Sequence, residues 1–322
     1  MEFFRPRIMN QIKEPLGESN PFGLDPHRIA VGIAHSDYVQ ALVRETPSLI
    51  DYVEIPFEQL LRTPSAIEIR ADLPVILHCA SLSLAGNVRP SDDIADRLTH
   101  WVAETGTPWV GEHLAYVTSS FAVAEASPHE PILSVESESG EASFNVGFTV
   151  SPQYSRPVLD RLRENLDFWR GSIGVPLLLE NGPIYVETPG STMSQGEFLQ
   201  AVCAETTADL LLDLSHLLIT CHNLGWDPFK FLLALPLSRV VEVHLSGTRE
   251  EGGLMWDDHA RSASDLVFGL LEHLLTVARP RAVTLEYNWD ANFPRVALLR
   301  DIERTRGVVR EAGRHYEEGV SH

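Results

Sequence analysis

The chain has 322 residues, 44% of them hydrophobic and 22% charged. It is long for one ordinary domain but suits a (β/α)8 barrel, which needs roughly 250 residues plus any insertions. Lys and Arg total 25 against 45 Asp and Glu, a formal net charge of -20. Such an excess of negative charge opposes contact with a phosphate backbone, so we expect no nucleic-acid partner.

Cysteine usage and hydropathy indicate a cytoplasmic protein. The three cysteines are Cys79, Cys203 and Cys221, an odd number without CxxC spacing, which predicts neither a disulfide framework nor a zinc knuckle. Residues 1–27 contain charges and prolines but no apolar core of a signal peptide. No later stretch offers the ~18 uncharged apolar residues of a membrane span, so we expect no membrane association.

Short runs rich in Leu, Ile and Val alternate along the chain with segments of helical period, the pattern of a parallel sheet with crossover helices. The predicted strands lie at 28–34, 51–56, 73–79, 108–117, 175–181, 209–216, 239–247 and 281–288. Helices are expected between them, for example at 91–106 and 262–278. Eight such units predict an α/β fold, a xylose-isomerase-like (β/α)8 TIM barrel over 28–312, with an N-terminal extension at 1–27 and a C-terminal tail at 313–322.

Residues 118–147 interrupt this pattern after the fourth strand. They are rich in Ser, Ala, Glu and Pro and show little periodicity, which indicates a long insertion loop with room for a short hairpin. Loops that follow barrel strands lie on the carboxyl-terminal face, where sites are built. The insertion is therefore either a cover for substrate or a variable solvent loop.

Imidazoles and carboxylates recur where the predicted strands end, and a further pair follows the seventh strand. They are His78, His113, Glu180, Asp213, His216, His244, Asp257, His259 and Glu286. Singly, each has a simpler explanation: a histidine can be structural, Glu180 can bond a helix N-terminus, and Asp213 can cap a turn. Together on one barrel rim they would carry large desolvation costs unless a cation offset them, and these donors suit Fe, Mn or Zn.

The number of donors predicts more than one ion. A mononuclear catalytic site takes about three protein ligands, and nine candidates suffice for two or three metals. A central carboxylate such as Glu180 can bridge two ions because each of its oxygens has free lone pairs.

Seven motifs resemble those of the multinuclear non-haem iron-dependent oxidative enzymes, a barrel family with two or three irons whose members include the enzymes of methanobactin biosynthesis. The motifs are "VILHCASLSLAG", "GEHLAYV", "PLLLENGPIYV", "LLLDLSHLLITCHNLGWDP", "VVEVHLSGT", "DDH" and "VTLEYNWD". The likeness runs from about residue 30 to 305. It implies iron ligation by His78, His113, Glu180, Asp213, His244, Asp257, His259 and Glu286. The run "DYVEIPFEQL" places Glu54 near the site without making it a ligand.

Two positions depart from the family pattern. His216 stands where the family commonly has Asn, and Gly111 stands where it often has Ser before Glu-His. The first departure exchanges an amide oxygen for a stronger imidazole donor, so it bears on the occupancy of that iron.

The resemblance implies that the protein uses O2 to modify cysteines of a ribosomally made precursor peptide, and that a partner protein delivers the peptide. In this interpretation Glu180, Asp213 and His244 are catalytic. The candidates to orient substrate are Asn181, His222, Asn223 and Arg249, with a structural role beside the ligands as the other reading of His222.

Two other function classes fit the same residues. A divalent-metal-dependent sugar isomerase or epimerase of the xylose-isomerase-like class also places Glu, Asp and His at strand ends, and Mn or Mg would suffice there. A non-catalytic metal-holding or peptide-binding subunit is the third possibility. Metal analysis after anaerobic purification would separate these classes.

Overall fold

A computed structural model describes residues 21–22, 28–122, 135–136, 141–288 and 293–320. Eight parallel strands close into a barrel, each hydrogen-bonded to its neighbours in chain order, with the last strand beside the first. This confirms the predicted (β/α)8 barrel. The barrel strands are β1 (Ala30–Ala34), β2 (Tyr52–Pro56), β3 (Val75–Cys79), β4 (Val110–His113), β8 (Leu177–Glu180), β9 (Asp209–Asp213), β10 (Val240–Leu245) and β13 (Ala282–Leu285).

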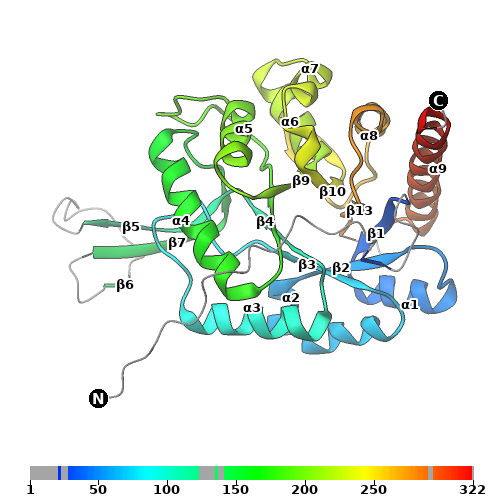
Figure 1. Ribbon diagram of the computed structural model, residues 1–322, viewed down its shortest axis with the longest axis horizontal. Coiled ribbons are helices and arrows are strands. Elements are labelled where there is room, and N and C mark those ends of the chain that lie inside the picture. The colour runs from blue at the N-terminus through cyan, green and yellow to red at the C-terminus, as the bar shows by residue number, and fades with distance from the viewer. Residues whose placement is uncertain (1–20, 23–27, 123–134, 137–140, 289–292, 321–322) are drawn as a thin grey trace.

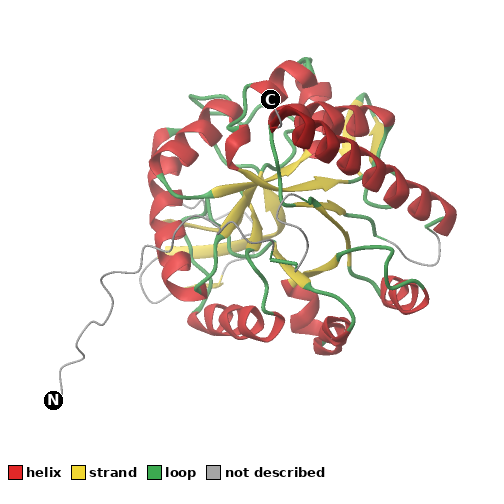
Figure 2. Cartoon of the chain, turned by 45° about the vertical axis from the view of Figure 1, so that its right-hand side comes forward, coloured by secondary structure: helices red, strands yellow, loops and turns green. Residues whose placement is uncertain are grey.

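Helices surround the barrel on its outside (Figure 2). The predicted helices at 91–106 and 262–278 are present as α3 and α8. The helices are α1 (Asp37–Glu45), α2 (Phe57–Arg62), α3 (Asp92–Thr105), α4 (Arg156–Ile173), α5 (Gln195–Glu205), α6 (Leu214–Leu224), α7 (Pro228–Leu233), α8 (Asp265–Val277) and α9 (Arg295–Val320), with short 3₁₀ segments at Pro64–Ala71 and Leu237–Arg239. Because α9 runs to Val320, residues 313–320 of the expected tail are helical.

The interior of the barrel is mostly apolar at its amino-terminal end. A separate buried cluster there contains side chains from the first half of the strands, among them Tyr52, Ile76, Leu178 and Leu211. Phe22 closes this end, with its ring stacked 4.8 Å from that of Tyr52. Successive inward-facing residues of a strand are two apart, so the next inward layer carries the residues that follow these by two positions. Those residues are Glu54, His78, Glu180 and Asp213.

The predicted insertion contains antiparallel strands β5 (Tyr116–Ala122), β6 (Val135–Glu136) and β7 (Glu141–Val150), in the order β5-β7-β6. This small sheet projects to one side of the barrel (Figure 1). The expected hairpin is therefore present, and its strands extend the insertion beyond residue 147. Residues 123–134 and 137–140 of the insertion, like most of the N-terminal extension, lie outside the described residues.

A second hairpin and one shifted boundary bear on the site. Strands β11 (Thr248–Glu251) and β12 (Leu254–Asp257) pair after β10. The sixth barrel strand ends at Asp213, which caps α6 by accepting a hydrogen bond from the backbone N–H of His216 at 2.6 Å. His216 therefore lies in the first turn of a helix rather than at the end of the predicted strand 209–216.

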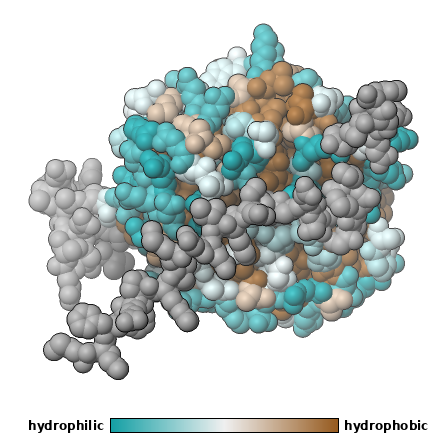
Figure 3. All heavy atoms as spheres, in the orientation of Figure 1, coloured by the Kyte–Doolittle hydropathy of each residue, from teal (hydrophilic) through white to brown (hydrophobic). Residues whose placement is uncertain are grey.

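The face seen in Figure 3 is mostly hydrophilic, with hydrophobic residues gathered near its top, where Figure 1 shows α6 and α7. Leu233 at the end of α7 is 53% exposed. Among the described helices, none combines the length and the hydropathy needed to cross a membrane.

Candidate metal centre

The structure brings all nine predicted ligands together at the carboxyl-terminal mouth of the barrel. Their donor atoms form three groups, in each of which these atoms lie within 4.8 Å of one another. We name them the first group (His78, His113 and Glu180), the second group (Glu180, Asp213, His244 and Glu286) and the third group (His216, Asp257 and His259).

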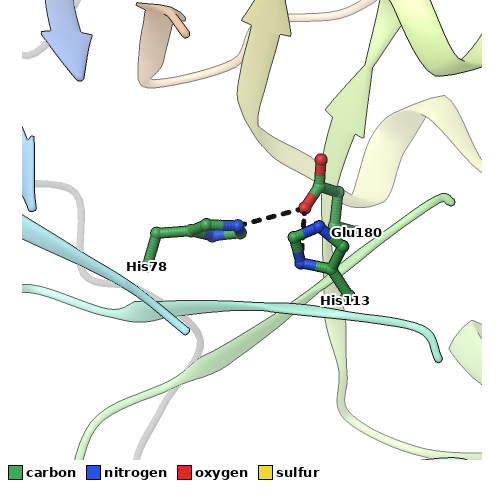
Figure 4. A group of neighbouring side chains, drawn as sticks. All are labelled: His78, His113 and Glu180. Carbon is green, nitrogen blue, oxygen red and sulfur yellow. Dashed lines mark ion pairs between the residues drawn. The ribbon is translucent and has the colours of Figure 1, made fainter. Parts of the chain in front are cut away.

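The first group comes from three neighbouring strands, β3, β4 and β8 (Figure 4). Nε2 of His78 and Nδ1 of His113 each lie 3.2 Å from the same oxygen, Oε2 of Glu180. Glu180 is fully buried and both imidazoles are largely so. His78, His113 and Glu180 would together offer three donors to a metal ion.

The second group centres on His244 of β10. Its Nδ1 lies 3.1 Å from Oε2 of Glu286 and 3.8 Å from Oε1 of Glu180. Its Nε2 lies 2.9 Å from Oε2 of Glu54, which is 1% exposed. An imidazole whose far nitrogen bonds a carboxylate is the arrangement that orients metal-binding histidines. Glu54 thus fixes the ring of His244 with Nδ1 toward the second group.

The third group has two histidines fixed in the same tautomer. Nδ1 of His216 lies 3.0 Å from the carbonyl oxygen of Asn181, and Nδ1 of His259 lies 2.8 Å from that of Glu286. A carbonyl oxygen only accepts, so each Nδ1 carries a proton. This leaves both Nε2 atoms facing Oδ2 of Asp257, at 3.4 Å and 2.6 Å.

Two carboxylates join the groups by presenting their oxygens to different neighbours. Glu180 directs Oε2 to the first group and Oε1 toward His244 and His216. Glu286 directs Oε2 to His244 and lies with Oε1 3.7 Å from Nδ1 of His259. Glu180 is therefore shared by the first and second groups, whereas Glu286 brings the third group close to the second without sharing a donor atom with it.

Unpartnered buried atoms test whether this donor set fits metal ions. Both ring nitrogens of His78, Nδ1 of His113, both oxygens of Glu180 and Oδ2 of Asp213 have no hydrogen-bond partner. Buried polar atoms are normally bonded, because leaving them bare costs free energy. Metal–ligand bonds of about 2.1 Å hold neighbouring donors roughly 3 to 3.5 Å apart, which matches the 3.2 Å separations of the first group. The donor set therefore fits metal ions.

Without a cation, the groups share protons instead. Burial opposes charge on His78, but Glu180 outweighs it and raises the pKa of His78 to about 10. Burial, together with the charges of Glu180, Asp257 and Glu286, raises the pKa of Asp213 to about 7. Burial lowers the pKa of His113. Such divergent shifts within one mouth mark a functional site.

The four predicted substrate-orienting residues lie after β8, in α6 and in β11. The amide of Asn181 bonds the backbone of Asp213, with both hydrogen bonds at 2.9 Å, and so positions this candidate ligand. His222 is exposed in the last turn of α6. Asn223 bonds both backbone groups of Met255 and thereby holds β12 against α6. Arg249 is partly exposed on β11 and pairs with Glu251 and Asp258.

Sequence reasoning missed Glu242, which forms a fourth group with Glu54 and His244. Glu242 is fully buried below His244 and accepts hydrogen bonds from Trp109 at 2.7 Å and Thr284 at 2.8 Å. Because Glu242 has these partners, it supports the ring of His244 from below. Its position two residues before His244 was the available signal, since both residues then face inward.

The structure also explains why Gly111 is the first residue of "GEH". A Cβ at Gly111 would lie 2.6 Å from Nδ1 of His78 and 2.8 Å from the side chain of Leu211. Because the interior is close-packed, a Cβ at this position would force His78 or Leu211 to shift. Glycine here lets the His78 ring pack directly on β4.

Fold and site together define a (β/α)8 barrel with candidate metal-binding groups at its mouth. The chain belongs to the family described as "RiPP precursor modification enzyme MbnB/TglH/ChrH", which it matches over residues 30–128 and 150–310. A "UPF0276 protein" of Streptomyces avermitilis is 30% identical over 88% of this chain and 55% of its own length, so the chain spans about half of that relative. Another, from Chromobacterium violaceum, is 28% identical over 85% of this chain and 92% of its own length.

Solved structures resemble the chain in fold alone. A D-tagatose 3-epimerase-like protein aligns with a TM-score of 0.50 and 14% identity over 91% of this chain and all of its own. The IOLI protein with a bound zinc atom aligns with a TM-score of 0.50 and 13% identity over 89% of this chain and 99% of its own. A xylose isomerase-like TIM barrel protein of Mycobacterium smegmatis, in complex with magnesium, gives 0.48 at 13% identity over 88% and 97%.

Proposed function

We propose that this protein is a multinuclear iron enzyme that uses O2 to modify cysteine residues of a ribosomally made precursor peptide. The observation that carries this proposal is the row of three neighbouring donor groups, of which the first two share Glu180. The family to which the chain belongs acts on precursor peptides, and the donor groups supply the place for redox-active ions.

The donors are compatible with iron, and the proposed reaction with O2 needs a redox-active metal. Imidazole and carboxylate together suit iron, whereas sites for Mg or Ca are built from oxygen alone. No cysteine enters the three groups within the described residues, so the donors do not favour a soft copper site. When bound, two or three iron ions would pass to O2 the electrons that the peptide cysteine loses on oxidation.

The protein's own groups then have distinct tasks. Glu180 neutralises positive charge at the centre of the row and ties the first two groups together. Asp213 is held by the amide of Asn181, and His244 is held by Glu54. We therefore assign Glu180, Asp213 and His244 to the catalytic core. Fixed donors of this kind spare the site any reorganisation during the reaction.

We further propose that a partner protein delivers the precursor peptide. The barrel, its helices and two hairpins account for the described part of the chain. None of these described elements forms a separate domain that would capture the leader segment of a peptide.

Metal analysis after anaerobic purification tests the proposed function. We expect at least two iron ions per chain, and O2 consumption when a cysteine-containing peptide encoded beside this gene is added. Manganese or magnesium together with turnover of a ketohexose would replace the proposal by a sugar epimerase. Bound iron without any O2 consumption would indicate a non-catalytic subunit.

A further inference from the structure

A pocket of about 360 Å³ opens beside the metal centre. His113, His216 and Asp257 form its inner end. Its walls come from two elements that the ligands do not use, the insertion strands β5 and β7 and the segment 182–189 that follows β8. The pocket is therefore continuous with the first and third groups.

The walls are apolar and hydroxylic. Tyr116, Phe148 and Val150 line the insertion side, and Ile184, Tyr185 and Val186 line the other. Among the described lining residues, the groups that ionise near neutral pH are confined to the inner end. A charged side chain entering between these walls would lose its hydration without gaining a partner, so the pocket selects against charge.

Hydrogen bonds hold both walls in place. Ser151 at the end of β7 donates to the carbonyl of Pro183 at 3.0 Å and so joins the two walls. The backbone N–H of Ile184 donates to Thr220 of α6 at 2.9 Å. Gln195 of α5, which is 1% exposed, donates to the carbonyl of Gly182 at 2.8 Å. Pre-formed walls lower the entropic cost of binding.

The mouth of the pocket exposes apolar surface on both sides. Phe148 is 66% exposed and Val186 is 67% exposed. The stacked rings of Tyr185 and Trp256, 4.7 Å apart, continue the apolar surface toward β12. Two exposed hydrophobic side chains at one opening mark a binding surface rather than a scattered pair.

We propose that this pocket is a subsite for an uncharged side chain of aromatic size, one that flanks the modified residue of the precursor peptide. The inference rests on the proposed function for the identity of the peptide, and it makes the insertion a determinant of sequence specificity. Phe148 and Val186 then close over the bound side chain from opposite walls.

Binding of synthetic hexapeptides to the metal-loaded protein tests this subsite without any turnover. The probes are Gly-Gly-Phe-Cys-Gly-Gly and its reverse-order partner Gly-Gly-Cys-Phe-Gly-Gly, with matched peptides in which Gly, Glu or Lys replaces Phe, measured by calorimetry. Burial of a Phe side chain predicts about 10- to 100-fold tighter binding of at least one Phe peptide than of its Gly match, and no gain for Glu or Lys. Equal affinity for the Phe and Gly peptides in both orders, or tightest binding of a charged peptide, would overturn the subsite.

Exposed positions supply variants that leave the fold intact. Phe148→Ser and Val186→Ser should each reduce the Phe preference severalfold, whereas Val296→Ser, at an 80% exposed position in α9, should leave it unchanged. A preference that survives both pocket variants contradicts the proposal. Iron content and O2 consumption are measured separately, so loss of the proposed chemistry with a retained Phe preference would reject the function but not the subsite.

Discussion

Glu180 is the residue on which the metal centre depends most, because its two oxygens serve different groups. Its burial is complete, and the surrounding histidines overcome the effect of burial and hold its pKa well below the usual value. A carboxylate kept ionised in a buried position needs positive partners on both sides.

Replacing this charge should therefore affect more than one ion. Glu180→Gln preserves size but removes the shared negative charge, and we expect metal affinity to fall by at least the ~10- to 100-fold typical of changes around a ligand. Metal content per chain, with circular dichroism as a check on folding, measures the effect.

His222→Asn is the matched control, since His222 is exposed in the last turn of α6. It should retain the wild-type metal content. Unchanged metal in Glu180→Gln would refute the assignment of the bridging carboxylate.

His216 is one of the two positions where the chain departs from the family pattern, and its hydrogen bonds fix the orientation of its imidazole. With Nδ1 bonded to the carbonyl of Asn181, Nε2 points to Asp257. His216→Asn should keep a weaker oxygen donor and part of the third ion, whereas His216→Leu should lose it and leave Asp257 with one imidazole. Iron spectroscopy and metal content distinguish the two variants. If both keep the full complement, His216 is not a ligand.

At the scale of elements, the strands place the ligands and the hairpins complete the site. The parallel barrel strands all end at the same mouth. Residues that are in register near these ends therefore lie there together: His113 pairs with Glu180, and His244 pairs with Asp213. The third group also needs Asp257, which comes from β12 and not from a barrel strand. The β11–β12 hairpin is therefore part of the site.

Asn223 holds this hairpin with two hydrogen bonds to Met255, at 2.9 Å and 2.8 Å. Asn223→Ala should destabilise the hairpin by about 1 to 3 kcal/mol, since the backbone groups of Met255 lose their partners. We expect a lower occupancy of the third ion and little change in the other two. Metal titration followed by spectroscopy resolves this; equal losses at all three sites would show that the hairpin does not act locally.

The sequence predicted the strands and the nine donors because two simple rules operate on them. Apolar runs mark buried strands, and polar residues directly after such runs lie at the mouth of a barrel. The same rules placed His216 in a strand, because a hydrophobic pattern alone does not show where a strand ends when a helix begins directly after it. They also gave no sign that the amides of Asn181 and Asn223 bond backbone groups far away in the sequence. Such contacts depend on tertiary packing and leave no local pattern.

At the scale of the whole molecule, the two ends of the barrel contribute differently to the stability of the fold. The amino-terminal end is closed by Phe22, whose ring contacts those of Tyr52 and Trp109. The carboxyl-terminal end gathers buried carboxylates and imidazoles, several of whose polar atoms have no hydrogen-bond partner. A protein that already carries a net charge of -20 gains twice from bound cations, through the local donors and through the overall field.

Removal of the metal should therefore lower the stability of the whole barrel. A ligand that binds only the folded state adds about 2.7 kcal/mol at a hundred times its Kd, and several ions add more. Because each kcal/mol shifts the Tm of a large domain by about 2 to 4 °C, a chelator should lower the Tm of the metal-loaded protein by several degrees or more. Re-addition of ferrous iron under anaerobic conditions should restore it. The Tm of Glu180→Gln should respond much less to the chelator, because this variant has already lost the shared carboxylate, whereas that of Val296→Ser should fall as in the wild type. A wild-type Tm that is insensitive to chelation, with metal shown by analysis to be gone, would mean that the donor groups are satisfied by protons alone and that the mouth of the barrel is not built around metal ions.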